Sequence, residues 1–152
     1  MANVLIDQKL MAIKLAANTK EEVLGTLSDK LFVLDLVTED FQKHLLEREE
    51  SFPTGLITSI PLALCHTEAQ YVKQAAMCCA SLLNPVEFHE MGNPDGIVKA
   101  EIVFLLALKD PKEQVPWLKK IASIFKDENA LKTIKNAPNA KALADFLSSI
   151  LS

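Results

Sequence analysis

The residues best suited to chemistry in this sequence lie between positions 48 and 67. An apolar run from Ile60 to Leu64 is typical of a buried strand, and Cys65 and His66 follow it directly. Open α/β sheets tend to place their chemistry at strand ends, so we expect His66 to face solvent there. An imidazole in that position can act as a covalent nucleophile and carry a phosphoryl group on a ring nitrogen. A surface histidine with no role is the alternative.

Arg48 is the second candidate, and it precedes a predicted turn at Thr54-Gly55. A guanidinium offers paired hydrogen-bond donors to the oxygens of a phosphoryl group. The alternative is that Arg48 lies at a helix C-terminus and is favoured there only by the helix dipole.

The segments Arg48-Glu49, Thr54-Gly55-Leu56 and Ala63-Leu64-Cys65-His66 together form a pattern. This pattern resembles the active-site stretch of the mannitol/fructose-type enzyme IIA domains of the bacterial sugar phosphotransferase system. In that family an Arg-Glu pair precedes a Thr-Gly-hydrophobic segment and a strand that ends in Ala-Ile-Pro-His. The resemblance implies that His66 is phosphorylated and that Arg48 lies beside it. Cys65 replaces the family's proline, which leaves the approach to the histidine less rigid.

Gln114 departs from the mannitol branch, where a second histidine opens the helix after the long buried strand. In this respect, and in the segments 52–56 and 84–88, the sequence is more similar to the galactitol-type branch. A glutamine can donate a hydrogen bond to a phosphoryl oxygen but brings no positive charge. An ordinary role at a helix start is an equally good interpretation of Gln114.

The resemblance implies that residues 1–152 form one enzyme IIA-like phosphocarrier domain. His66 would accept a phosphoryl group from the general histidine phosphocarrier protein and pass it to a cysteine of a sugar-specific enzyme IIB, for uptake of galactitol or a related polyol. No metal or organic cofactor is implied. We expect an apolar docking surface around His66, with Leu56, Leu62 and Leu64 as candidates. The sequence leaves open which sugar is carried and which ring nitrogen is phosphorylated.

Two further functions use the same residues. Phosphorylation of His66 could switch the binding of a partner, which would make the chain a regulatory interaction module. Cys65 could instead act as a thiol nucleophile with His66 as its base. Adjacent residues on a strand point to opposite faces, so we expect Cys65 to turn inward and this third function to be disfavoured.

Composition narrows the class of protein. The net charge of −4 gives no electrostatic footprint for nucleic acid, and no apolar run approaches the ~20 residues that span a bilayer. The N-terminus lacks the pattern of a signal peptide. Three cysteines without CxxC spacing indicate a reducing compartment and no structural zinc. We expect a cytoplasmic protein, with a monomer favoured although the sequence does not fix the oligomeric state.

Hydrophobic periodicity and capping residues predict the elements that position these side chains. Thr19 and Glu22 have the spacing of a capping box and predict the start of a first helix. Thr38 is expected to cap a second helix that ends near Arg48, and Asp127 is expected to cap a short helix that ends at Lys135. A later helix is expected to begin at Pro116 rather than at Asp110-Pro111, and the last helix follows 138–139. The predicted strands cover 10–15, 60–64, 75–83, 86–88 and 101–108. The fold class is α/β (α+β), a single-domain sandwich with a central mixed sheet flanked by helices on both faces.

Overall fold

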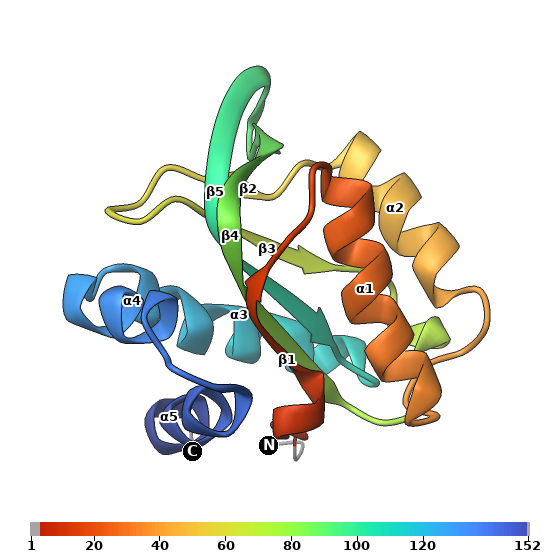
Figure 1. Cartoon of the computed structure of the whole chain (residues 1–152). Coiled ribbons are helices and arrows are strands. Elements are labelled where there is room, and N and C mark those ends of the chain that lie inside the picture. The colour runs from red at the N-terminus through yellow and green to blue at the C-terminus, as the bar shows by residue number, and fades with distance from the viewer. Residues whose placement is uncertain (1–3, 152) are drawn as a thin grey trace.

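The computed structural model describes residues 4–151, which fold around a five-stranded mixed sheet (Figure 1). Its order is β1-β4-β2-β3-β5, and β4 and β5 also pair with each other. The strands are β1 (Met11–Leu15), β2 (Gly55–Leu56), β3 (Leu62–His66), β4 (Ala76–Glu90) and β5 (Asn93–Ala107).

Helices cover both faces of this sheet. Figure 1 shows α1 (Lys20–Val33) and α2 (Phe41–Ser51) on one side, and α3 (Pro111–Phe125), α4 (Glu128–Lys135) and α5 (Ala140–Leu151) on the other. Short 3-10 turns at Gln8–Leu10 and Ala69–Tyr71 complete the fold. The mixed sheet between helical layers confirms the predicted fold class.

β3 lies between β2 and β5 and ends at the candidate histidine. It pairs in parallel with β5, from Leu62 opposite Ile102 to His66 opposite Leu106. The strand is buried from Leu62 to Cys65, as the continuous apolar run requires of a strand covered on both faces. His66 is its first residue with partial exposure, so the end of the strand is also the point where the chain reaches the surface.

β4 and β5 form one long antiparallel hairpin whose tip projects beyond the body of the molecule (Figure 1). The two separate strands predicted at 75–83 and 86–88 are therefore wrong, because β4 is continuous from Ala76 to Glu90. Its register with β5 shifts between Ser81 and Val86, and Pro85 lies within that irregularity. A proline is tolerated there because the bulge needs no ladder donor at that position.

Gly55 lets β2 fit between two longer strands. It pairs with Ala63 of β3 and with Glu90 of β4. A Cβ atom on Gly55 would lie 2.6 Å from the backbone oxygen of His89 and 3.0 Å from Val98 Cβ. Thr54 and Gly55 were expected to form a turn, but Gly55 is instead the first residue of β2. Glycine is required there because of this close approach.

The predicted N-terminus of α1 is confirmed. The Thr19 hydroxyl accepts a hydrogen bond from the Glu22 N–H at 3.2 Å, while the Glu22 carboxylate accepts one from the Asn18 N–H at 2.8 Å. The predicted cap of α2 is wrong, because this helix begins at Phe41 and ends at Ser51. The Thr38 backbone N–H donates to the Tyr71 carbonyl instead, which holds Thr38 against another segment before the helix starts.

The start predicted for α3 is also wrong. The Asp110 carboxylate accepts a hydrogen bond from the Lys112 N–H at 2.9 Å, and Pro111 occupies the first turn. A proline suits that position because its missing N–H would have no partner there. Pro116 lies inside the helix and leaves only the Lys112 carbonyl without its i+4 donor.

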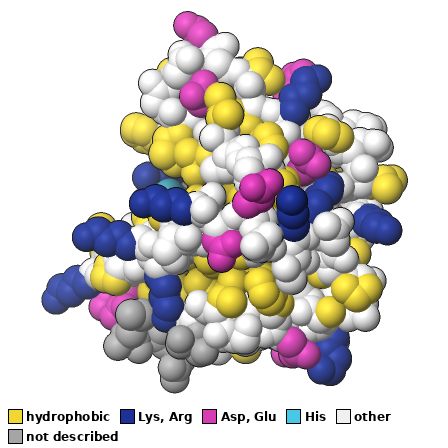
Figure 2. Space-filling view, turned by 90° about the vertical axis from the view of Figure 1, so that its left-hand side faces the viewer, with side chains coloured by type: hydrophobic (Ala, Val, Ile, Leu, Met, Phe, Trp, Pro, Cys, Tyr) yellow, Lys and Arg dark blue, Asp and Glu magenta, His cyan; other side chains and the backbone are white. Residues whose placement is uncertain are grey.

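The face drawn in Figure 2 carries hydrophobic side chains interspersed with both basic and acidic ones. Among the helices in the described part of the chain, none combines the length and apolar character needed to cross a membrane.

Candidate functional site

His66 presents one ring nitrogen to the surface and keeps the other inside. Its Nδ1 atom is buried, and no residue from 4 to 151 gives it a hydrogen bond of good geometry. The ring as a whole is partly exposed. Nε2 is therefore the nitrogen that an approaching group can reach.

The surroundings of His66 favour the neutral imidazole. Burial and then the charge of Arg48 lower its pKa below the ordinary value of 6.5, while the Leu64 backbone and the charge of Glu68 oppose this in smaller measure. In a neutral ring whose Nε2 carries the lone pair, the proton lies on the inner nitrogen, Nδ1. The ring is then a neutral nucleophile near pH 7.

Arg48 is the only arginine in the sequence and lies in the last turn of α2. Its guanidinium carbon lies 5.1 Å from the ring centroid of Phe52, and Nη1 lies 3.6 Å from Glu68 Oε1. The structure thus brings Arg48 close enough to His66 to act on it electrostatically. A shallow hollow beside the guanidinium is lined by His44, Glu47, Arg48, Ser51, Phe52 and Glu68.

The segment after His66 is fixed by its own side chains and by α3. The buried Thr67 hydroxyl donates to Glu68 Oε2 at 2.6 Å. Gln114 Nε2 donates to the Thr67 carbonyl at 3.4 Å. The contact of Gln114 is therefore with the backbone that follows the histidine.

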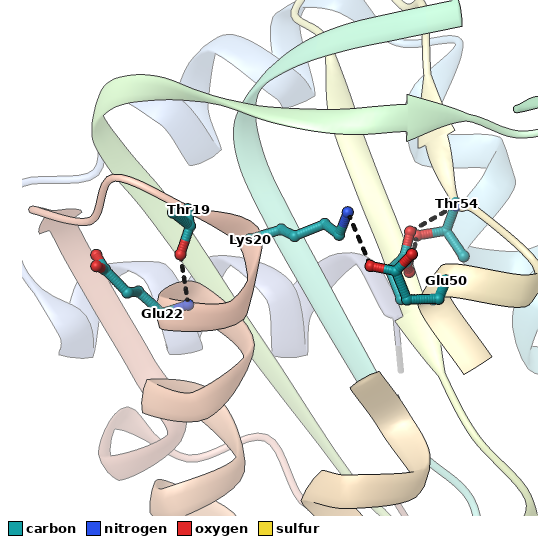
Figure 3. A network of polar contacts seen from close by, with 6 residues as sticks. Thr19, Lys20, Glu22, Glu50 and Thr54 are labelled. Atoms are coloured by element: carbon teal, nitrogen blue, oxygen red, sulfur yellow. Dashed lines mark hydrogen bonds and ion pairs between the residues drawn. The ribbon is translucent and has the colours of Figure 1, made fainter. Parts of the chain in front are cut away.

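A buried polar network lies on the other side of β3. The Glu49 carboxylate, only 4% exposed, accepts hydrogen bonds from the Thr54 N–H at 2.9 Å and the Thr54 hydroxyl at 2.8 Å. That hydroxyl also lies 3.4 Å from Cys65 Sγ. Figure 3 shows the hydrogen bonds of Thr54 next to the ion pair between Lys20 of α1 and Glu50 of α2. The Lys20 Nζ and Glu50 Oε1 atoms of that pair lie 3.5 Å apart. The network joins the end of α2 to β2 and β3, the elements that carry Arg48 and His66.

Cys65 has the environment of a structural thiol. It is fully buried, and burial followed by the nearby Glu49 charge raises its pKa well above the ordinary value. A thiol in that state is neither accessible nor ionised at neutral pH. The structure therefore gives no support to a Cys65 nucleophile.

The three leucines expected to dock a partner do not form a surface at the site. Leu62 and Leu64 are 0% and 5% exposed, so this expectation is corrected: their side chains pack in the core. Leu56 is partly exposed but pairs with Leu62 at the start of β3, about 13 Å along the strand from His66. The exposed apolar side chains next to site residues are Phe52, at 63%, and Val115, at 59%.

The other two histidines lie on α2 and β4. His44 stacks on Tyr71 with ring centroids 4.1 Å apart, and its Nδ1 lies 3.6 Å from a Glu47 carboxylate oxygen. His89 lies in β4 opposite Ile97. In the part of the chain that the structure describes, no three His, Cys, Asp or Glu side chains gather in a way that could hold a metal ion.

The sequence pattern did not single out Glu68 or Phe52 as site residues, although both contact Arg48. A usable signal was present for Glu68, since an acidic residue two positions after a candidate phosphoryl acceptor changes the charge at that site. Phe52 could be recognised only once α2 was known to extend to Ser51.

Residues 4–150 match the family described as "Phosphoenolpyruvate-dependent sugar phosphotransferase system, EIIA 2". The galactitol-specific EIIA component of Escherichia coli is 23% identical over 133 residues, which cover 87% of this chain and 88% of that protein. The transcriptional regulator ManR of Bacillus subtilis is 29% identical over 100 residues, or 66% of this chain and 14% of the regulator.

The fold has solved counterparts. In the complex of the mannitol enzyme IIA with phosphorylated enzyme IIB from Escherichia coli, the matching chain has a TM-score of 0.77 and 18% identity over 97% of this chain and 99% of its own length. A putative PTS IIA from Streptococcus mutans gives a TM-score of 0.78 at 17% identity, covering 94% of this chain and 89% of that one. The sequence match spans nearly all of this chain, and it therefore belongs to the EIIA 2 family of the sugar phosphotransferase system, as a phosphotransferase component with a phosphoryl carrier role.

Proposed function

We propose that Nε2 of His66 is the phosphoryl carrier of this chain, receiving its group from the general histidine phosphocarrier protein and passing it to a cysteine of a sugar-specific enzyme IIB. The observation that carries the proposal is a neutral, part-exposed imidazole at the end of β3, next to the only arginine in the sequence.

The transfer needs no proton to move. The Nε2 lone pair of His66 attacks phosphorus, the P–N bond of the donor histidine breaks, and its electron pair returns to the donor nitrogen. The proton on the inner nitrogen of His66 stays where it is. Arg48 would neutralise part of the charge on the equatorial oxygens, which is the main catalytic requirement of phosphoryl transfer.

The partner surface proposed here consists of Phe52 and Val115 around His66. Both are exposed, and each is adjacent in sequence or space to a site residue: Phe52 packs on Arg48, and Val115 follows Gln114. A small apolar surface of this kind suits two partners that dock in turn and exclude water during transfer.

We propose galactitol or a related polyol as the cargo of the system. Support comes from the similarity to the galactitol-specific EIIA component and from Gln114, the residue that distinguishes this chain from the mannitol pattern. Purified galactitol and mannitol enzymes IIB, offered to the phosphorylated protein in parallel, test this choice. Faster transfer to the galactitol enzyme is expected, and equal or faster transfer to the mannitol enzyme would refute it.

Intact mass after incubation with phosphoenolpyruvate, enzyme I and the histidine phosphocarrier protein tests the carrier itself. Wild type should gain one acid-labile phosphoryl group, and His66→Ala should gain none. The matched controls His44→Gln and His89→Gln should behave as wild type. A phosphoryl group that persists in His66→Ala, or a folded wild type that gains none, would contradict the proposal.

Regulation is the second candidate function, favoured by the similarity to part of ManR. In that case phosphorylation of His66 changes the binding of a partner and the group is not passed on. Transfer from the phosphorylated protein to any enzyme IIB favours transport. Absence of onward transfer, together with a phosphorylation-dependent partner, favours regulation.

A further inference from the structure

Glu68 forms an ion pair with Arg48 in the unphosphorylated protein. Its Oε1 lies 3.6 Å from Arg48 Nη1, and its Oε2 accepts the hydrogen bond of the Thr67 hydroxyl at 2.6 Å. Its side chain remains about half exposed, at 54%. One oxygen is therefore oriented by the chain while the other faces the guanidinium.

The segment that carries Glu68 is anchored by the buried Thr67 side chain and by a hydrogen bond from α3. Thr67 is 2% exposed, and its carbonyl accepts the Gln114 amide from α3 at 3.4 Å. Arg48 is less constrained, since its other contact is the ring of Phe52. Of the two charged groups, the guanidinium is the one that can reorient without disturbing the backbone around His66.

A phosphoryl group on Nε2 of His66 would compete for the same guanidinium. Glu68 follows His66 by two residues and its partner Arg48 ends α2, and the charges of both act on the His66 ring and so on a charge placed there. Arg48 cannot fully neutralise a carboxylate and a phosphoryl group together. The dianion carries more charge and can take both donors of the fork, so it has the advantage.

We propose that Glu68 is a positioning residue that holds Arg48 in the unphosphorylated protein and yields it to the phosphoryl group on His66. The inference rests on the carrier function proposed above. Losing the ion pair makes acceptance of the phosphoryl group less favourable. The displaced carboxylate then repels the phosphoryl group, which favours onward transfer. Glu68 thus sets how readily the phosphoryl group on His66 is passed on.

Glu68→Gln tests the inference, because the amide oxygen can still accept the Thr67 hydrogen bond but carries no charge. At equilibrium with the histidine phosphocarrier protein, the ratio of phosphorylated to unphosphorylated variant should rise by about two- to fivefold over wild type, the range of a part-exposed ion pair. Transfer to an enzyme IIB should slow by a similar factor. Glu50→Gln is the matched control, since Glu50 is an exposed carboxylate of the same helix as Arg48 that pairs with Lys20 and does not line the hollow, and it should leave both quantities unchanged.

A double-mutant cycle with Arg48→Ala separates this role from a general effect of charge. Glu68→Gln should change the phosphorylation equilibrium less when Arg48 is absent, because the carboxylate then has no guanidinium to hold. An unchanged equilibrium in Glu68→Gln, or the same shift with and without Arg48, would overturn the inference.

The wild-type protein distinguishes a failure of the role of Glu68 from a failure of the carrier function. If wild type accepts a phosphoryl group and Glu68→Gln behaves identically, only the role of Glu68 fails. If folded wild type accepts none, the carrier function fails and the role of Glu68 fails with it.

Discussion

Arg48 combines several contacts in one side chain: it lies over Phe52, pairs with Glu68 and lowers the pKa of His66. We expect Arg48→Ala to slow phosphoryl acceptance by about 10²- to 10³-fold, the range seen when one donor to a developing charge is removed. Rapid-quench measurement of acceptance gives the rate. The thermal unfolding midpoint should change little, because the side chain is partly exposed. Acceptance at the wild-type rate would refute the assigned role.

Arg48→Lys is the informative control for that prediction. A lysine keeps the positive charge but loses the planar pair of donors, so it should recover only part of the rate. Full recovery would mean that charge alone is required at this position and that the fork geometry has no part in transfer.

The lowered pKa of His66 predicts the pH dependence of acceptance. Burial and the charge of Arg48 hold the pKa below 6.5, so the imidazole stays neutral, and able to accept the group, at a pH where a free histidine is largely protonated. The rate of acceptance by wild type should therefore have its acidic midpoint below 6.5. Proton NMR titration of the ring gives the pKa directly. In Arg48→Ala this pKa should rise, and a pKa that falls or stays constant would show that Arg48 does not act on the ring.

The junction of α2 with β2 depends on one buried carboxyl. Burial raises the pKa of Glu49 above 4.5, and its hydrogen bonds to Thr54 and Cys65 and the charge of Lys20 oppose that effect in smaller measure. The folded protein therefore binds the Glu49 proton more tightly than the unfolded chain. The stability from this proton is fully present below pH 4.5 and is lost as the pH rises through the raised pKa.

Glu49→Gln should remove that loss. Urea unfolding from about pH 4 to about pH 8 should show a smaller decline in the free energy of unfolding for the variant than for wild type. Glu50→Gln, which changes a neighbouring carboxylate that is 66% exposed, serves as the control and should keep the wild-type decline. Parallel curves for wild type and Glu49→Gln would contradict a raised pKa at Glu49.

Gly55 makes the same junction sensitive to a single methyl group. Gly55→Ala places a Cβ 2.6 Å from the His89 backbone oxygen, and this oxygen belongs to a paired strand that cannot easily move. We expect a loss of about 1–3 kcal/mol in the free energy of unfolding, measured in urea. Gly25→Ala is the control, since its Cβ would meet only the flexible end of Gln42 at 3.2 Å in a helix that favours alanine. Equal stability of Gly55→Ala and wild type would mean that β2 can shift.

The elements that the sequence predicted well are those determined by neighbours in the chain. The cap at Thr19, the buried strand before His66 and the helix from Asp127 to Lys135 depend on local hydrogen bonds and apolar runs, and all are present. The continuity of β4 through Pro85 depends on pairing with β5, which no local pattern records.

The errors at Thr38 and Pro116 have different origins. Thr38 is held by Tyr71, more than thirty residues away, whereas α3 begins with a local cap at Asp110 and continues through Pro116, where the proline was expected to start the helix. At the site, the order of residues gave the positions of Arg48 and His66 around the same strand end. The roles of Phe52 and Glu68 depend on side-chain contacts that only the folded molecule defines.

Exposed apolar side chains are spread over the whole molecule, and comparing those close to site residues with a distant one tests where partners dock. Phe52 contacts Arg48 and Val115 follows Gln114, whereas Ile57, 70% exposed, follows β2 near the start of β3. Phe52→Ser and Val115→Ser should each raise by about tenfold the KM for the histidine phosphocarrier protein and the KM for enzyme IIB. An aromatic or aliphatic contact buried in an interface contributes on the order of 1 kcal/mol or more to binding.

Ile57→Ser should leave both KM values unchanged, because its side chain lies about a strand length from the histidine. The kcat of transfer should be similar in Val115→Ser and Ile57→Ser, since neither residue contacts Arg48 or the phosphoryl group, whereas Phe52→Ser also removes the ring beside the Arg48 guanidinium. An effect of Ile57→Ser as large as that of Phe52→Ser would place the docking surface at the other end of β3. In that case the partners would have to span the length of the strand to reach His66, and the hollow beside Arg48 would not belong to the interface.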